Sequence, residues 1–425
     1  MKRKNIHFHI QYIILLIIVF ALPLKRNYIP PLLLLLSLNW LVEILTDTLY
    51  LFIYRIKNHK IPFIPRWKII QENKLLLPFL LYVGLFTFYA IGLLYSENIS
   101  FGINDIVLKL PLLAMPLIVF TYEVKKWTLT RIKILFNIYF IGCFFAIMYN
   151  VYHSYINFTE YFNFAHFFYL LASFLHHPSY ASMFYTFALA AMIYFLLNKK
   201  TIIIEKILYF LFIPVFIAEV FLLSSKTAFL VLFILFILLI IYILFCKHIQ
   251  KKNLIYILII LIIGGRMYAY LPDKFNRFTK KLESIQGVKD IRDDGRYTIW
   301  FYALQVAKEN FPCGTGTGDV KDALKYKYLQ KLKLDYYVRE YNCHNQYLQL
   351  FVTLGIFGCL LFIVGQGYNV VIAYKKKYFL FFIFTLIVGI NFLTEAMLER
   401  QSGVVFFAVF NTILCVFTFA EKLKD

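Results

Sequence analysis

Long uninterrupted stretches of apolar residues are the feature that most constrains this chain. Each runs for about 17 to 25 residues, the length at which an α-helix crosses the hydrocarbon core of a bilayer. Of the 425 residues, 61% are hydrophobic and only 16% are charged, too few polar side chains to cover a water-facing surface. A soluble globular fold is therefore excluded, and the sequence predicts an all-α polytopic membrane protein.

The apolar stretches predict about twelve membrane spans. They cover approximately residues 8–24, 31–54, 75–95, 105–121, 132–156, 179–197, 202–222, 227–246, 253–265, 345–365, 378–394 and 403–420. No small-residue cleavage site follows the first stretch, so we expect it to be retained as a span. The second stretch contains Glu43 and Asp47 and would be tilted or broken there. The ninth is short, so a count between about ten and thirteen stays open.

Basic residues gather in every second connection between the predicted spans. The N-terminus and the connections after the second, fourth, sixth, eighth and tenth spans are rich in Lys and Arg, whereas residues 157–180 contain neither. Short cytoplasmic loops are enriched in these residues, so both termini are predicted to be cytoplasmic. The same bias accounts for the net charge of +21, and we expect no nucleic-acid partner.

One connection, from about residue 264 to 343, is much longer and more polar than the rest. The charge alternation places it outside the cytoplasm, and apolar residues at helical spacing predict helices over 295–310 and 319–332. Connections of this length are usually functional or disordered, and we expect a small folded cap. The predicted organisation is nine spans in residues 1–263, the loop or cap in 264–343 and three spans in 344–425.

Three polar groups on this outer side are candidates for binding an anion. Ser225 and Lys226, between the seventh and eighth spans, offer a cation for a phosphate, or a lysine anchored at the membrane edge. Arg296 opens the first helix of the cap, and its guanidinium matches phosphate oxygens bidentately; a helix-start ion pair is the alternative. Gly316 and Gly318 lie in a run of alternating glycines that would bring backbone amides to an anion, or form a flexible turn.

A fourth group, His344 and Asn345, lies where the chain enters the tenth span. Imidazole titrates near neutral pH and can take a proton from a sugar hydroxyl, so His344 is a candidate general base; a helix cap is the alternative. Glu219 and Glu395 are further candidates, because carboxyl groups inside a membrane are usually functional unless they pair with a neighbouring cation.

The remaining signals concern sulfur and metal chemistry. The six cysteines form no CxxC pair, so neither a zinc site nor a redox motif is predicted. Cys313 and Cys343 both lie in the outer connection and would pair there if their separation allows it. The adjacent His176 and His177 reach the outer side but point in different directions, which argues against a metal pair. We expect no metal and no cofactor.

Taken together, these features resemble the O-antigen ligase family, which shares a superfamily with O-antigen polymerases and bacterial protein O-oligosaccharyltransferases. The most specific segments are GRYTIWFYALQVAKENFPCGTGTG and CHNQYLQLFVTLGIFG, with HHPSYAS, LLSSKTAFL and GLLYSENISFGINDIVLKLPLLAMPLI in the matching order. The resemblance implies a GT-C-type fold and a metal-independent, inverting glycosyltransferase. Its donor would be a polyprenyl (undecaprenyl) pyrophosphate glycan and its acceptor a lipid A-core sugar, on the periplasmic side of the bacterial inner membrane.

The resemblance also implies roles for particular residues. Arg296 matches the family's essential loop arginine and His344 the histidine of its HNQYLQ segment. Lys226 stands where the family more often has an arginine, a change that keeps the cation but loses bidentate geometry. Lys226 and Arg296 would stabilise the pyrophosphate leaving group, and His344 would take the proton of the acceptor hydroxyl. The residues expected to support them are Ser225, Asn345, Gly316 and Gly318.

Other functions remain open at this point. An O-antigen polymerase needs the same cations and base but uses a second carrier-linked glycan as acceptor, and a protein-glycosylating relative would differ only in its acceptor. A secondary transporter or lipid flippase is an alternative of a different class. Transporters often show inverted repeats and charges near the membrane midplane. No repeat is visible here and the candidate residues gather on one face, which argues against a transporter. The HNQYLQ and GIFG segments favour a ligase over a polymerase.

Overall fold

The computed structural model of the chain describes residues 2–56, 66–198, 200–245 and 295–420. All the regular secondary structure in these ranges is helical. Seven helical segments there are long and apolar enough to cross a membrane, and three shorter helices are also apolar. This architecture agrees with the predicted all-α polytopic membrane protein.

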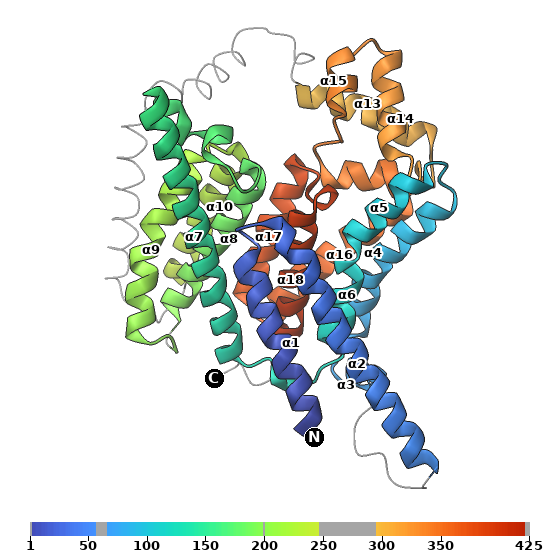
Figure 1. Ribbon diagram of the computed structural model, residues 1–425, viewed down its shortest axis with the longest axis vertical. Helices are drawn as coiled ribbons and strands as arrows, with labels where there is room; N and C mark the ends of the chain where they lie inside the picture. The colour runs from blue at the N-terminus through green and yellow to red at the C-terminus, as the bar shows by residue number, and fades with distance from the viewer. Residues whose placement is uncertain (1, 57–65, 199, 246–294, 421–425) are drawn as a thin grey trace.

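Figure 1 shows how the helices are arranged. They are α1 (Lys2–Ala21), α2 (Ile29–Ile56), α3 (Arg66–Glu72), α4 (Leu76–Leu94), α5 (Ile99–Lys109), α6 (Pro111–Phe120), α7 (Leu129–Tyr161), α8 (Pro178–Leu197), α9 (Ile203–Leu222), α10 (Lys226–Phe245), α13 (Gly295–Glu309), α14 (Val320–Gln330), α15 (Leu334–Arg339), α16 (Gln346–Lys375), α17 (Phe379–Thr394) and α18 (Gln401–Thr418). The three cap helices α13, α14 and α15 lie at one end of the molecule, here called the cap end, and α1 begins at the opposite end.

The span expected at 105–121 is confirmed as an apolar segment long enough to cross a membrane, Ile99–Phe120, but it is divided into two helices at Leu110. The chain is already helical from Ile99, breaks between Lys109 and Pro111, and continues as α6. Proline lacks an amide hydrogen and restricts the residue before it, so it begins a helix more readily than it continues one. The helices expected at 295–310 and 319–332 are present as α13 and α14. The span expected at 253–265 lies outside the described residues, as does the part of the cap at 264–294.

Helix α18 forms the centre of the bundle. Every residue from Ser402 to Thr418 is buried, as expected for a helix that is apolar around its whole circumference. The rings of Phe406 and Phe410 pack on Phe187 of α8 at centroid distances of 5.6 and 5.0 Å. Helices α6, α16 and α17 also contact α18. The apolar core therefore joins spans from both halves of the chain.

Glu43 and Asp47 do not break α2, so of the two outcomes expected for the second span, tilted or broken, the break does not occur. Arg66 of α3 reaches both carboxylates, with its Nη2 atom 3.0 Å from Glu43 Oε2 and 3.5 Å from Asp47 Oδ2. Tyr122 also donates a hydrogen bond to Glu43. A buried carboxylate is tolerated when it is paired and hydrogen-bonded, so the helix continues through both acidic residues.

Helix α16 bends sharply at Gly355, where φ is 67° and ψ is −163°. The Sγ atom of Cys359 lies 3.5 Å from the carbonyl oxygen of Tyr347, although the two residues are twelve apart in sequence. A straight helix would separate them by about 18 Å. At the bend, the amide of Ile356 donates to the carbonyl of Pro312 at 2.9 Å. The bend therefore docks the loop that follows α13 onto α16.

Substitution of Gly355 by alanine is expected to destabilise the protein strongly. A Cβ atom there would lie 1.9 Å from the carbonyl oxygen of Pro312, and the positive φ disfavours any L side chain. We expect a loss of about 3 kcal/mol, measured as a lower unfolding temperature in detergent. Gly367→Ala is the matched control, because a Cβ there meets nothing within 4 Å. Equal unfolding temperatures for the two variants would contradict this account of the bend.

Candidate functional site

The cap end brings His344, Glu395 and Arg296 into one charged cluster. His344 Nδ1 lies 2.9 Å from Glu395 Oε2, and Arg296 Nη2 lies 3.5 Å from Glu395 Oε1. The three residues come from the entrance to α16, the end of α17 and the start of α13. Two of the residues predicted from sequence, His344 and Arg296, are thus joined through a third candidate, Glu395, for which the sequence suggested only a neighbouring cation as partner.

The conformation of His344 is fixed by its neighbours in the chain. Its φ is 44°, in the left-handed region that residues other than glycine seldom adopt. The amide of His344 donates to Asn342 Oδ1 at 3.0 Å, and Asn345 caps α16 by accepting from the amide of Leu348 at 3.0 Å. Asn345 therefore supports the cluster by fixing where α16 begins, with the imidazole one residue before it.

Glu395 is the first residue after α17, in an extended conformation. Burial favours the neutral carboxyl, but the hydrogen bond and charge of His344 and the charge of Arg296 outweigh it, so the pKa of Glu395 lies below its usual value. The ionised carboxylate can only accept hydrogen bonds. The His344 Nδ1 atom must therefore carry a proton, which leaves Nε2 as the acceptor in the neutral ring.

The lowered pKa of Glu395 predicts how its contribution to stability depends on pH. Such a group stabilises the fold above its ordinary pKa, and the contribution is lost as pH falls through the folded-state pKa. Glu395→Gln should lower the unfolding temperature by about 2 °C at neutral pH. The difference should shrink as pH falls below about 4.5, where the carboxyl of the unfolded chain takes up a proton, and it should vanish once pH has fallen through the lower pKa of the folded state.

Thermal unfolding of both proteins from pH 3 to pH 8 measures this difference. Glu72→Gln is a suitable control, since Glu72 pairs only at the surface with Lys68, 3.7 Å away. A difference between wild type and Glu395→Gln that stays constant down to pH 3 would contradict the ionised pairing.

Arg296 is partly exposed within this cluster. It is the second residue of α13, and its side chain is 43% exposed even though it contacts Glu395. Part of the side chain is therefore accessible to an anion from solvent. His177, the residue before α8, lies close enough to interact electrostatically with Glu395, His344 and Arg296, and burial is the main cause of its lowered pKa. The HHP segment thus reaches the cluster, as its position in the sequence indicated.

Lys226 lies beside this cluster without a described contact to it. The residue begins α10 and is exposed. Its neighbour Thr227 donates a hydrogen bond from Oγ1 to Thr394 Oγ1 at 2.8 Å, which places the start of α10 against the residue that precedes Glu395. Ser225 is buried and caps α10 by accepting from the amide of Ala228 at 3.4 Å. Ser225 therefore has a structural role in presenting Lys226.

The glycine-rich turn does not cradle an anion, because its amides are already used. Those of Gly316 and Gly318 donate to the Thr353 carbonyl at 3.0 Å and to Ser96 Oγ at 2.9 Å. Added Cβ atoms would lie 2.6 Å from Ser96 Oγ at Gly316 and 2.4 Å from the Asn98 carbonyl at Gly318. The turn is therefore a tightly packed joint between the cap helices and α4, and these glycines support the site by permitting close approach.

Several other candidates from the sequence have structural partners elsewhere. Glu219 accepts a hydrogen bond from Asn150 Nδ2 at 3.3 Å, and His176 lies 3.2 Å from Ser402 Oγ. Cys313 is exposed and Cys343 is buried, and both are free thiols, so the disulfide considered from sequence is not formed. Within the described ranges, no group of three or more His, Cys, Asp or Glu side chains is arranged to hold a metal ion.

An ion cluster that the sequence did not reveal lies next to the site. Lys109 is fully buried, donates a hydrogen bond to Asp105, and places its Nζ 3.4 Å from Glu399 Oε1 and 4.5 Å from the ring centroid of Tyr89. Glu399 ends η7 (Met397–Glu399), the short helix between α17 and α18. The two ends of this cluster are far apart in sequence, so no local pattern could have paired them.

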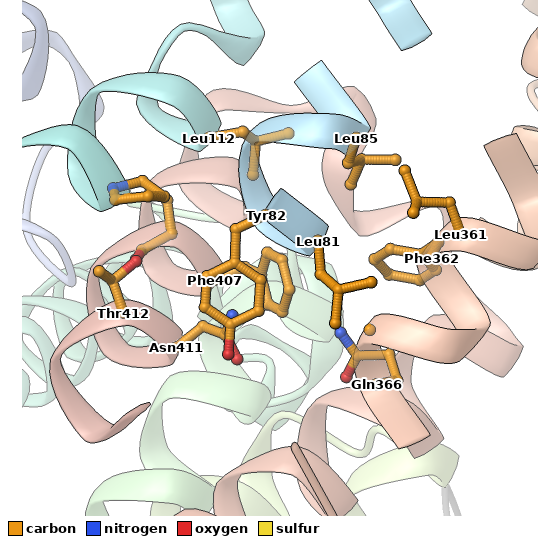
Figure 2. A pocket seen from close by; sticks show the side chains of 13 residues that line it. Leu81, Tyr82, Leu85, Leu112, Leu361, Phe362, Gln366, Phe407, Asn411 and Thr412 are labelled. Carbon is orange, nitrogen blue, oxygen red and sulfur yellow. The ribbon is translucent and has the colours of Figure 1, made fainter. Parts of the chain in front are cut away.

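A small pocket also opens between α4, α6, α16 and α18 (Figure 2). Most of its wall is apolar and is formed by residues that include Leu81, Leu85, Leu112, Leu361 and Phe362. Tyr82, Gln366 and Asn411 add polar groups along one side. The pocket holds no member of the charged cluster, so it is a separate feature of the transmembrane region.

A bundle of apolar spans and a charged cluster beneath a helical cap define a polytopic membrane protein with a polar site at the cap end. Residues 211–363 match a protein family described as O-antigen ligase, which confirms the resemblance to that family and, with it, to the superfamily of O-antigen ligases and polymerases. The matched residues include Lys226, Arg296 and His344, whereas Glu395 lies beyond them. A search of curated proteins found no match.

Proposed function

We propose that the protein is an O-antigen ligase-type glycosyltransferase. It transfers a glycan from undecaprenyl or another polyprenyl pyrophosphate to a sugar hydroxyl of the lipid A core, with inversion at the anomeric carbon. The observation that carries this proposal is that Glu395 contacts both His344 and Arg296. These contacts place an oriented base beside a cation, in a chain that matches the O-antigen ligase family over residues 211–363.

In this mechanism His344 is the general base. Glu395 holds the Nδ1 proton, so Nε2 accepts the proton of the acceptor hydroxyl as its oxygen attacks the anomeric carbon. The carboxylate also stabilises the imidazolium that forms. Glu395 does not touch the reacting atoms in this scheme, and we assign it the role of positioning residue for His344.

The cations act on the leaving group. Negative charge develops on the pyrophosphate as the anomeric bond breaks, and preorganised cations in a dry site stabilise that charge. The guanidinium of Arg296 is partly exposed, and a guanidinium can bind two phosphate oxygens at once. Lys226, presented at the start of α10, adds a point charge without bidentate geometry. These side chains would supply the stabilisation that the chemistry needs.

The membrane supplies the setting for both substrates. We propose about twelve spans in a GT-C-type arrangement in the bacterial inner membrane, with both termini in the cytoplasm and the charged cluster facing the periplasm. Donor and acceptor both carry lipid tails, which the bilayer around the spans would hold.

A product assay with the purified full-length protein tests this function. The protein in detergent, without divalent metal, is given a polyprenyl-pyrophosphate glycan with and without lipid A-core. Transfer of the glycan to lipid A-core is the expected result. Longer carrier-linked glycans formed without lipid A-core would instead indicate a polymerase. If no acceptor receives glycan and reconstituted vesicles move lipid or solute, the transporter alternative replaces the proposal.

A further inference from the structure

The ion cluster at Lys109 secures the segment that carries Glu395. Residues 395–400 connect α17 to α18, and they hold Glu395 at their start and Glu399 within η7. The carboxylate of Glu399 is 3.4 Å from the ammonium of Lys109, which α5 contributes from the other half of the chain. A fully buried ammonium is costly unless it is compensated, and here two carboxylates and the ring of Tyr89 surround it.

Two hydrogen bonds hold the same segment at its backbone. The amide of Leu398 donates to Gln346 Oε1 at 2.7 Å, and the hydroxyl of Tyr180 donates to the Ala396 carbonyl at 3.5 Å. Gln346 is two residues beyond His344. The first of these bonds therefore fixes the position of residues 395–400 relative to the residues next to His344. The Lys109 contact adds a charged anchor from α5.

From these contacts we infer that Lys109 is a positioning residue of the proposed reaction. By holding Glu399, it fixes the segment so that the Glu395 carboxylate stays within hydrogen-bond distance of His344 and in contact with Arg296. This inference rests on the proposed glycosyltransferase function for its kinetic consequences. Its structural content, the orientation of His344, does not depend on which reaction the protein catalyses.

Two variants each remove one charge from the cluster. Burial raises the pKa of Glu399, Asp105 adds to this effect, and Lys109 opposes it. When Lys109 is replaced by methionine, Glu399 can therefore take up a proton and remain buried without a charge. Glu399→Gln is the second variant, because it keeps the shape of the side chain and the hydrogen bond while it removes the charge.

The kinetic test is a double-mutant cycle in the full-length protein. Lys109→Met should lower kcat by about tenfold to a hundredfold, as the loss of an orienting partner does elsewhere, with little change in KM for the donor. In a protein that already carries Glu395→Gln, Lys109→Met should lower kcat by less than about twofold, because the carboxylate that Lys109 positions is already absent. Fully additive effects would overturn the inference.

A matched control separates positioning from general stability. Lys327 is also a nearly buried lysine paired with a carboxylate, that of Glu309, but it lies within the cap helices. Lys327→Met should lower the unfolding temperature and leave kcat per folded molecule unchanged. If Lys109→Met behaves in the same way, with kcat unchanged, Lys109 has only a structural role.

A spectroscopic readout works even if no glycan transfer is found. Protein labelled with ¹⁵N-histidine is reconstituted in nanodiscs, and the His344 signals are assigned by comparison with His344→Gln. Wild type should show the Nδ1-protonated tautomer, and both Lys109→Met and Glu399→Gln should redistribute the ring between tautomers. An unchanged His344 spectrum in both variants refutes the positioning role. If the wild type transfers no glycan but the His344 spectrum changes in the variants, the proposed function is refuted and the positioning role of Lys109 is not.

Discussion

Substitution of His344 by glutamine is expected to lower kcat for glycan transfer by about 10²- to 10⁴-fold. Glutamine can still donate a hydrogen bond to Glu395, but it cannot accept the proton of an attacking hydroxyl. KM for the lipid-linked donor should change little, because the proposed contacts of the donor are with Arg296 and Lys226. Steady-state kinetics with the purified variant measure both constants.

His7→Gln provides the control for this substitution. His7 also pairs through Nδ1 with a side-chain oxygen, that of Asn39 at 2.9 Å, but it lies in α1 far from the cap helices. This variant should keep wild-type activity. A His344→Gln enzyme that retains more than about a tenth of the wild-type kcat would remove His344 from the role of general base.

Arg296→Ala is expected to have the second largest effect, a loss of about 10²- to 10³-fold in kcat/KM. The substitution removes a cation from the leaving group and also releases one oxygen of Glu395. Arg296→Lys should recover only part of the loss, since an ammonium keeps the charge but cannot bind two phosphate oxygens in one plane. The donor should bind more weakly in both variants, which a titration with the lipid-linked glycan would show.

The control for Arg296 is Arg339→Ala. Arg339 is an exposed arginine of the same cap, and its Nη1 atom donates to the hydroxyl of Tyr341 at 3.0 Å. Loss of this arginine should leave kcat/KM within about twofold, because an exposed surface contact contributes little. If Arg339→Ala and Arg296→Ala impair transfer equally, a general positive charge on the cap would explain the result better than a leaving-group contact.

Local patterns were sufficient to predict most of the helices. The lengths of the apolar stretches located the spans, and apolar residues at helical spacing located α13 and α14. The break before Pro111 was missed, because the stretch stays apolar across it and hydropathy alone does not register the backbone restriction of proline. Glu43 and Asp47 suggested a tilted or broken helix. Their partner Arg66 lies on a separate helix, so the sequence alone did not show that the two carboxylates are paired.

The candidate site was predicted less completely than the fold. His344 and Arg296 could be selected by residue type and neighbours, but the partner of Glu395 depends on where α13, α16 and α17 end in space. Alternating glycines suggested an anion cradle, and only the structure shows that their amides bond to α4 and α16. The role of Lys109 could not be predicted, because in the sequence it is a single lysine in an ordinary helical stretch. Only the fold places Glu399 beside it.

The joint at the bend of α16 has a consequence for how substrates reach the cluster. Pro312, Thr315 and Gly316 bond to the backbone of α16, and Asp319 accepts from the amides of Glu97 and Asn98 at 2.8 Å each. This side of the cluster is closed by hydrogen bonds to backbone groups, and these bonds would have to break before a substrate could enter here. A bulky lipid-linked substrate is therefore expected to avoid this flank and to approach the cluster from another, such as the one where α10 begins beside Thr394.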